Sequence, residues 1–211
     1  MTILVCVAHP DDEAIGVGGT IAKYTKKGRD VVSIIFSLGE GSNPLLDPEY
    51  LTKTRRSESK KVGKKLGVKD VVFMGLGDVG FLKDIAHPEV KEQFKGYLRK
   101  FNPDFLFTHC IDDPHPHHRA LANLVKESIK DLKLKTRIYT FTVTNPLRIV
   151  HRERPRLYVD VSDTFETKLK ALDMFKSQKE YMFYFKPMLR LLSWYYGFKS
   201  GYKYAEVFHL W

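Results

Sequence analysis

Segments typical of buried strands alternate with segments typical of helices over almost the whole chain, beginning with the apolar run Ile3–Ala8. A short, uninterrupted apolar run of this kind indicates a strand that is buried on both of its faces. We expect further strands at Val31–Phe36, Val71–Met74, Phe105–Thr108, Arg137–Val143, Leu157–Val161 and Tyr204–Leu210. The segments between them predict helices at Ala14–Lys27, Pro48–Leu66, Glu89–Phe101, Pro116–Leu132, Phe165–Ser177 and Pro187–Trp194.

Repeated strand–helix units of this kind predict a mostly parallel sheet with helices on both faces. Gly67 is typical of a helix end, and Ser162-Asp163 is typical of a helix cap. A length of 211 residues favours one domain over two. We therefore predict a single Rossmann-like, three-layer α/β domain over residues 1–211, with its ligands beyond the carboxyl ends of the strands.

The composition argues against several other classes of protein. No apolar run is long enough to span a bilayer, and Met1–Ala8 lacks the basic region and cleavage site of a signal peptide, so we expect a cytoplasmic protein. The two cysteines, Cys6 and Cys110, cannot build a disulfide framework. The net charge of +10 is spread over several predicted helices rather than gathered in one arm, so we expect no specific nucleic-acid site.

Histidine and aspartate residues are concentrated after two of the predicted strands. The segment His9–Glu13 follows the first strand, while His109 and the segment Asp112–Arg119 follow the fourth. Four of the eight histidines lie after the fourth strand, and a fifth lies after the first. Because the carboxyl ends of parallel strands meet at one edge of a sheet, we expect both loops to open at the same place.

This combination of residues fits a hydrolytic metal site. Zinc takes imidazole and carboxylate ligands, and a catalytic zinc keeps one position for water. His9 and Asp12 are three residues apart across a turn stiffened by proline, and His115 and His118 share one face at a helix start. Asp11 is then a spare carboxylate beside a ligand, able to take a proton from the metal-bound water.

Three other interpretations stay open at this point. Either loop alone is typical of plain structure, with Asp11 or Asp12 acting only as a helix cap. His9, Asp11 and His118 also resemble the facial triad of non-haem Fe(II) oxygenases, although that triad usually stands on an all-β scaffold. The non-enzymatic alternative is a metal- or nucleotide-binding regulatory module without turnover.

Several residues near these loops are expected to be structural. Gly16–Gly19 invites comparison with a dinucleotide-binding fingerprint, but other residues separate it from the strand, so we expect close packing of a helix start on the sheet. Glu13 is expected to place a favourable charge at a helix start. His109 is either a partner of a metal ligand or a buried histidine with satisfied hydrogen bonds. No function is expected for His87, His151 and His209.

The opening segment Ala8-His9-Pro10-Asp11-Asp12-Glu13, followed by Gly18-Gly19-Thr20, matches a highly specific family motif. Weaker matches continue along the chain. They comprise Arg55-x-x-Glu58, Leu66-Gly67-Val68, Gly77-Asp78, Asn102-Pro103-Asp104, Lys168, Ala171, Ser177-Gln178 and Ala205-Glu206-x-Phe208. On these residues the chain resembles the PIG-L/LmbE-like N-deacetylases over nearly its whole length.

The resemblance implies a hydrolase with one zinc ion per chain, which removes the N-acetyl group from an N-acetylglucosamine-containing substrate. It implies zinc ligands at His9, Asp12 and His118, and a general base at Asp11 that activates the metal-bound water. The acceptor stays open among free N-acetylglucosamine, a chito-oligosaccharide, a thiol-cofactor precursor and an inositol conjugate. The implied partner is thus a small amino-sugar conjugate.

The resemblance also implies roles for three further residues. His115 matches a histidine that stabilises the oxyanion and assists protonation of the leaving group, and Arg55 and Asp78 match positions associated with substrate binding. One departure concerns His117, because the family usually has aspartate at this position of its second motif. Without that negative charge the pKa of His115 should be lowered, unless Asp112 or Asp113 takes its place.

The segment 181–204 is rich in Tyr, Phe and Trp and carries several basic residues. Four interpretations fit this composition: aromatic packing of a C-terminal lobe, an aromatic wall for a sugar ring, the interface of a homo-oligomer, and an interfacial helix. The last rests on the apolar stretch Met188–Tyr196, with Lys186, Arg190 and Lys199 in or beside it.

Overall fold

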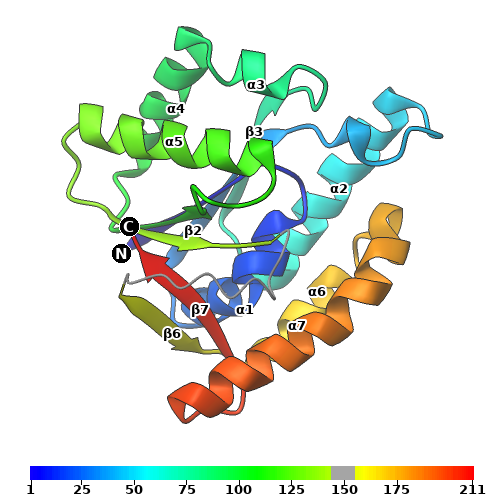
Figure 1. Ribbon diagram of the computed structural model, residues 1–211, viewed down its shortest axis with the longest axis vertical. Coiled ribbons are helices and arrows are strands. Elements are labelled where there is room, and N and C mark those ends of the chain that lie inside the picture. The colour runs from blue at the N-terminus through cyan, green and yellow to red at the C-terminus, as the bar shows by residue number, and fades with distance from the viewer. Residues whose placement is uncertain (144–154) are drawn as a thin grey trace.

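A sheet with the strand order β3-β2-β1-β4-β5-β7-β6 runs through the centre of the protein in a computed structural model that describes residues 1–143 and 155–211 (Figure 1). Its strands are β1 (Thr2–Val7), β2 (Asp30–Ser37), β3 (Asp70–Leu76), β4 (Phe105–His109), β5 (Arg137–Phe141), β6 (Arg156–Asp160) and β7 (Ala205–Leu210). β1 to β5 pair in parallel, and β7 runs antiparallel to both β5 and β6. The predicted mostly parallel sheet is confirmed.

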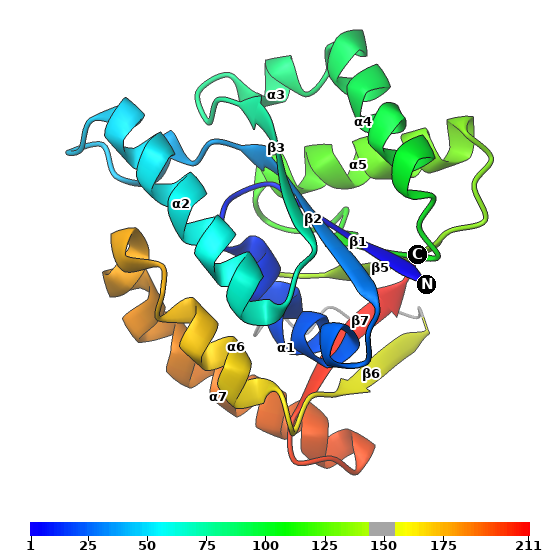
Figure 2. The ribbon, with the colours of Figure 1, turned by 180° about the vertical axis from the view of Figure 1, so that it is seen from behind.

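Helices cover both faces of this sheet, as the two opposite views in Figures 1 and 2 show. The helices are α1 (Asp12–Lys26), α2 (Pro48–Leu66), α3 (Phe81–Asp84), α4 (Pro88–Phe101), α5 (Pro116–Asp131), α6 (Phe165–Leu172) and α7 (Lys179–Ser200), with short 3-10 turns η1 (Glu40–Ser42) and η2 (Lys176–Gln178). Side chains of α1, α2, α6 and α7 form one core with the sheet, and those of α3, α4 and α5 form a second core on its other face. The predicted three-layer α/β architecture is therefore confirmed.

Local sequence signals explain where α2 begins and ends. The Asp47 side chain accepts a hydrogen bond from the Tyr50 amide (2.8 Å) at the start of α2, and Gly67 ends that helix with a φ of 81°, as its sequence predicts. The predicted cap at Ser162-Asp163 is wrong. The cap residue of α6 is Thr164, because the Ser162 hydroxyl instead donates to Asp160 Oδ1 at 2.6 Å.

The C-terminal helices differ in length from their predictions. The helix predicted over Phe165–Ser177 ends at Leu172, and η2 follows after a short break. The helix predicted at Pro187–Trp194 extends over Lys179–Ser200 and contains Pro187 in its interior. Met182, Phe185 and Leu189 bury one side of α7 in the core on both sides of that proline, and this packing compensates for the hydrogen bond that proline cannot make.

The glycines near the start of α1 permit close packing, as expected. A Cβ atom at Gly16 would lie 2.3 Å from the Phe141 ring, and one at Gly19 would lie 3.0 Å from Val161. These positions face the protein interior rather than a nucleotide. None of the helices in the described ranges 1–143 and 155–211 combines the length and the apolar character needed to cross a membrane.

Candidate active site

The two His/Asp loops meet at the point where the order of the parallel strands changes direction, between β1 and β4. β1 pairs with β2 on one side and with β4 on the other. The helix that follows β1 packs in one core, and the helix that follows β4 packs in the core on the opposite face. This arrangement opens a crevice at the carboxyl ends of β1 and β4, which is the usual ligand position in a doubly wound sheet.

His9, Asp12 and His118 form a small triangle in this crevice. Asp12 Oδ2 lies 3.2 Å from His9 Nδ1 and 3.4 Å from His118 Nε2, and the two imidazole nitrogens are 3.3 Å apart. A tetrahedral ion with bonds of about 2.0–2.1 Å needs ligand atoms about 3.4 Å apart. The three side chains therefore fit one metal ion and leave its fourth position open.

The charges around the triangle also suit a cation. Burial by itself would lower the pKa of His118, but the carboxylates of Asp12 and Asp113 raise it to about 9. Burial would raise the pKa of Asp12, yet the imidazoles of His118 and His109 hold it well below its ordinary value. The carboxylates of Asp12 and Asp113 thus favour a positive charge at this position. Asp113 Oδ1 accepts from His118 Nδ1 at 3.0 Å and leaves Nε2 for the ion.

Asp11 lies beside the triangle without joining it. Its Oδ2 accepts a hydrogen bond from Arg55 Nη2 at 2.8 Å, and the same guanidinium donates to the carbonyl oxygens of Pro10 and Gly39. Burial raises the pKa of Asp11 to about 6, although the Arg55 charge opposes this rise. A carboxylate with a pKa near neutrality is well matched to general-base catalysis.

The backbone of Asp11 is strained. Its φ of 121° lies in a region that residues other than glycine rarely adopt. Asp11 is the N-cap residue of α1, but its side chain makes no capping hydrogen bond, so the plain capping interpretation fails for Asp11. Its amide instead donates to Glu13 Oε2 at 3.1 Å, which helps to hold this conformation.

Glu13 binds the backbone of this turn, and its surroundings oppose the charge that was expected of it at the helix start. Burial, followed by the nearby Asp11 carboxylate, raises the pKa of Glu13 to about 8. The group is therefore mostly protonated at neutral pH and acts through hydrogen bonding rather than through a charge at the helix start.

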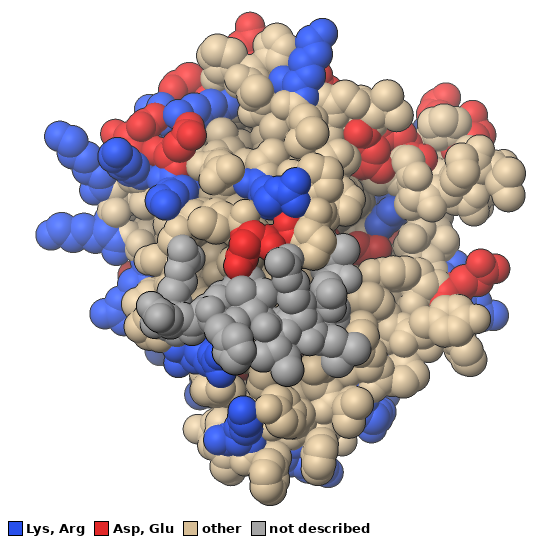
Figure 3. Space-filling model, viewed as in Figure 1, with Lys and Arg blue, Asp and Glu red and all other residues tan. Residues whose placement is uncertain are grey.

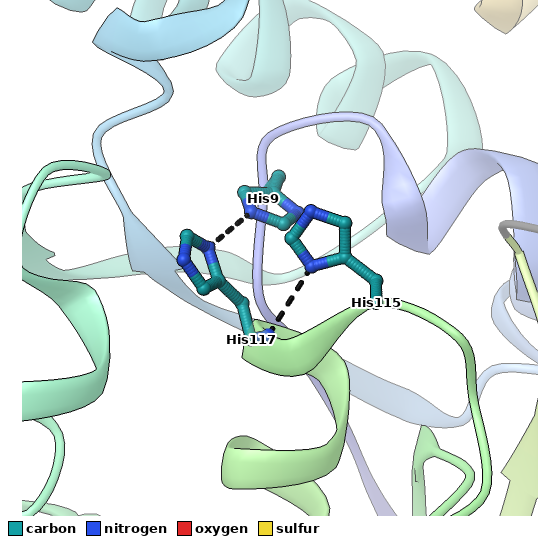
Figure 4. A group of neighbouring side chains, drawn as sticks. All are labelled: His9, His115 and His117. Atoms are coloured by element: carbon teal, nitrogen blue, oxygen red, sulfur yellow. Dashed lines mark hydrogen bonds between the residues drawn. The ribbon is translucent and has the colours of Figure 1, made fainter.

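His115 and His117 lie beside His9, with their ring centroids 4.9 and 5.2 Å from that of His9 (Figure 4). His117 Nδ1 is 3.0 Å from His9 Nε2, and the His117 ring stacks on Phe81 with centroids 4.3 Å apart. His115 Nδ1 accepts a hydrogen bond from the His117 amide at 3.2 Å. Neutral His115 therefore carries its proton on Nε2 and can donate it.

The pKa of His115 is low, in the direction expected from the replacement of the family aspartate by His117, but His117 is not the main cause. Burial, followed by the neighbouring imidazoles of His118 and His9, lowers it to about 4. The Asp113 carboxylate accepts from the His115 amide at 2.9 Å and from His118 Nδ1 at 3.0 Å.

His109 contacts two residues of the triangle, Asp12 and His118. Its Nε2 lies 3.3 Å from Asp12 Oδ2 and accepts from the Ala8 amide at 3.0 Å, and its ring stacks on His118 with centroids 3.8 Å apart. Between its two expected roles, the geometry therefore favours a partner of the ligands. The position of His151 falls outside the described residues.

Asp78 and Tyr181 help to line a cleft of about 410 Å³ over the triangle, together with Arg55, Ser42 and Gln178. The Asp78 carboxylate accepts from the Ser37 hydroxyl and from the Gly41 amide (2.8 Å). Tyr181 was not predicted individually, because only the aromatic density of residues 181–204 indicated a ligand wall. Burial raises its pKa, so the phenol stays protonated and keeps a hydrogen to donate.

Two imidazoles, a carboxylate ligand and a separate basic carboxylate at this edge of the sheet are typical of a metal-dependent hydrolase. The Fe(II) triad fits less well, because Asp11 pairs with Arg55 and the scaffold is not all-β. Residues 4–129 match the PIG-L family model, described as GlcNAc-PI de-N-acetylase, and the chain belongs to this family. The chain is thus a member of a family of amide hydrolases that act on carbon–nitrogen bonds other than peptide bonds.

Relatives with named activities agree with this assignment. The diacetylchitobiose deacetylase of Thermococcus kodakarensis is 32% identical over 97% of this chain and 80% of its own length. A probable N-acetyl-alpha-D-glucosaminyl L-malate deacetylase 2 of Bacillus cereus is 29% identical over 85% of this chain and 84% of its own. The solved structure of N,N'-diacetylchitobiose deacetylase from Pyrococcus horikoshii superposes with a TM-score of 0.81 at 28% identity, covering 100% of this chain and 83% of that one.

Proposed function

We propose that the protein is a zinc-dependent hydrolase that removes the N-acetyl group from an N-acetylglucosamine-containing substrate. The observation that carries this proposal is the triangle of His9, Asp12 and His118 with ligand atoms 3.2–3.4 Å apart, next to an Asp11 carboxylate that is not part of it. The relatives named above act on N-acetylated amino sugars, which supports the same class of substrate.

Zinc held by these three side chains would lower the pKa of water at the site and polarise the substrate carbonyl. Asp11 takes the proton from the attacking water at its free carboxylate oxygen. Arg55 keeps the other oxygen of Asp11 fixed at 2.8 Å, so the geometry adds an orienting role for Arg55 to the predicted contact with substrate. His115 Nε2 donates a hydrogen bond to the oxygen that becomes negative in the transition state, and protonated His115 gives its proton to the departing amine nitrogen.

The cleft above the triangle favours a sugar. Tyr181 supplies an aromatic ring and a hydroxyl, Asp78 supplies a carboxylate, and Gln178 supplies an amide at the walls of this cleft. Such a mixture of one aromatic face with several hydrogen-bonding groups suits a pyranose ring. We propose Asp78 as a substrate-binding residue on this basis.

We further propose a cytoplasmic location and no specific nucleic-acid partner. The view in Figure 3 shows Lys and Arg side chains at many separate places on the surface rather than in one continuous basic groove. Dispersed charge of this kind binds the phosphates of a nucleic acid only weakly, and this binding is lost as the salt concentration rises.

The direct test combines metal analysis with acetate release. We expect one zinc ion per chain, loss of turnover with a chelator and recovery on addition of zinc. Acetate should appear from at least one member of a panel of N-acetylglucosamine, diacetylchitobiose, and the malate and inositol glucosaminides. Stoichiometric metal without acetate from any member would instead favour the regulatory module without turnover. A chain that binds no zinc would contradict the proposed site.

The role of His115 predicts a pH effect at position 117. Replacing His117 by aspartate should raise the pKa of His115, because an anion stabilises the imidazolium whose ring centroid lies 4.8 Å from the present His117 ring. If protonated His115 assists the leaving amine, activity falls above this pKa. The alkaline limb of kcat/KM should then move up by about one pH unit with unchanged zinc content.

A neutral replacement is the matched control for this shift. His117→Asn removes the imidazole without adding charge and should leave the alkaline limb within a few tenths of a unit of its position. An alkaline limb that does not move in His117→Asp would show that His115 acts as a neutral hydrogen-bond donor rather than as an acid.

A further inference from the structure

Helix α7 is apolar on two opposite sides. Met182, Phe185 and Leu189 pack one side into the core. The other side carries a solvent-facing aromatic stripe, made up of Phe183, Tyr184, Leu191, Trp194, Tyr195 and Phe198. Tyr184 and Phe198 at its ends are 77% and 76% exposed. Because a helix that is apolar all round is normally buried, this stripe is expected to have a partner.

A large groove lies beside the stripe. It has a volume of about 840 Å³ and is lined by side chains from α6, η2 and α7. Its apolar lining includes Leu169, Leu172, Phe175 and Met182. Phe183 and Tyr184 belong to both the groove and the stripe, so the apolar parts of the two adjoin.

The charged side chains in and beside this surface are mostly positive, with Glu180 as an acidic side chain that also lines the groove. Lys186 pairs with Asp173 and Arg190 pairs with Glu166. Four further lysines stand in η2, in α7 or just after it: Lys176, Lys179, Lys199 and Lys203. None of these four has an acidic partner among residues 1–143 and 155–211. In Figure 3 the surface over α7 is largely tan, with separate blue groups at its margins.

We propose that this face of α7 docks on the surface of an anionic lipid bilayer, with the helix lying in the plane of the headgroups. Trp and Tyr rings prefer this depth, and lysine side chains extend from an apolar face toward lipid phosphates. A second copy of the chain fits less well, because a symmetric contact would bring two sets of unpaired lysines together. The proposal concerns lipid binding and does not depend on the proposed activity.

Tryptophan fluorescence can report the contact directly. The chain has two tryptophans, and Trp211 lies at the C-terminus on the far end of β7, so Trp211→Phe leaves Trp194 as the single reporter. With vesicles of equal parts phosphatidylcholine and phosphatidylglycerol, Trp194 emission should shift to shorter wavelength and be quenched by brominated lipid. Co-sedimentation should be strong at low salt and weak at high salt, and weak on phosphatidylcholine alone.

Substitutions on the stripe test whether it makes the contact. The variant Tyr184→Ser/Leu191→Ser/Phe198→Ser keeps Trp194 and changes only exposed side chains, so circular dichroism should match the parent. Its affinity for the anionic vesicles should fall at least about tenfold. The matched control Leu45→Ser/Val79→Ser/Leu82→Ser changes three exposed apolar residues elsewhere and should bind like the parent.

Two results would overturn the proposal. One is the absence of a Trp194 shift with anionic vesicles at low salt. The other is a dimer in light scattering that the stripe variant dissociates, without vesicle binding by the parent, because a second copy would then be the occupant of this surface.

Discussion

Replacing Asp11 by asparagine is expected to lower kcat by roughly 10²–10⁴ while zinc content stays at the wild-type level. The amide has nearly the same shape and can still accept a hydrogen bond from Arg55, but it cannot take a proton from water. Its carbonyl oxygen can replace the oxygen that now lies 2.8 Å from the guanidinium, so the local structure should persist. Acetate release and metal analysis on the same preparation measure both quantities.

Two neighbouring carboxyl groups serve as controls. Glu13→Gln removes a group that is mostly protonated at neutral pH and keeps an acceptor for the Asp11 amide, so turnover should stay close to normal. Asp12→Asn should instead lose the metal. If Asp11→Asn loses zinc as completely as Asp12→Asn, or turns over normally, Asp11 is not the base.

Replacing Lys168 by methionine is expected to destabilise the fold by about 3–5 kcal/mol. Lys168 Nζ lies 2.6 Å from Glu206 Oε1, and both side chains are buried. Among residues 1–143 and 155–211, the variant leaves the Glu206 carboxylate with the amides of Gly19 and Thr20 as its donors, at 3.0 and 2.8 Å. Urea denaturation, analysed with an unchanged m-value, measures the loss of free energy of unfolding.

An exposed lysine on the same helix provides the matched substitution. Lys170→Met changes an exposed side chain of α6 and should alter stability by no more than about 0.5 kcal/mol. The double variant Lys168→Met/Glu206→Gln should recover part of the loss, because it no longer buries an unpaired charge. Equal stabilities of Lys168→Met and Lys170→Met would mean that the buried pair contributes nothing to the fold.

The fold was readable from the sequence because local patterns and long-range packing agree. Short runs rich in apolar residues marked the strands of the described residues to within a few residues, most clearly the continuous run of β1, which is buried on both faces. The short elements η1 and α3 were missed, because three or four residues are too few to show a helical period. The extent of α7 was underestimated, because Pro187 is a helix breaker unless tertiary contacts hold both sides of it.

The candidate site was only partly readable. Spacing placed His9 and Asp12 together, and strand order placed His118 beside them, but no local pattern indicated that Arg55 reaches Asp11 from another helix. The structure also explains two of the weaker family matches, which the sequence alone did not connect. Glu58 accepts from the Ser177 amide and hydroxyl at 2.9 and 2.6 Å, so these two distant motifs clamp α2 to η2.

The positive φ of Asp11 lowers the stability of the fold at the same residue whose carboxylate the proposed reaction requires. A residue other than glycine pays about 1–3 kcal/mol for such a conformation. Glycine at this position would relieve that cost and remove the carboxylate at the same time. A chain selected for stability alone would therefore move away from aspartate here. The Glu13 carboxyl and the Arg55 guanidinium hold this turn through its backbone atoms, the Asp11 amide and the Pro10 carbonyl, so neither contact depends on the Asp11 carboxylate.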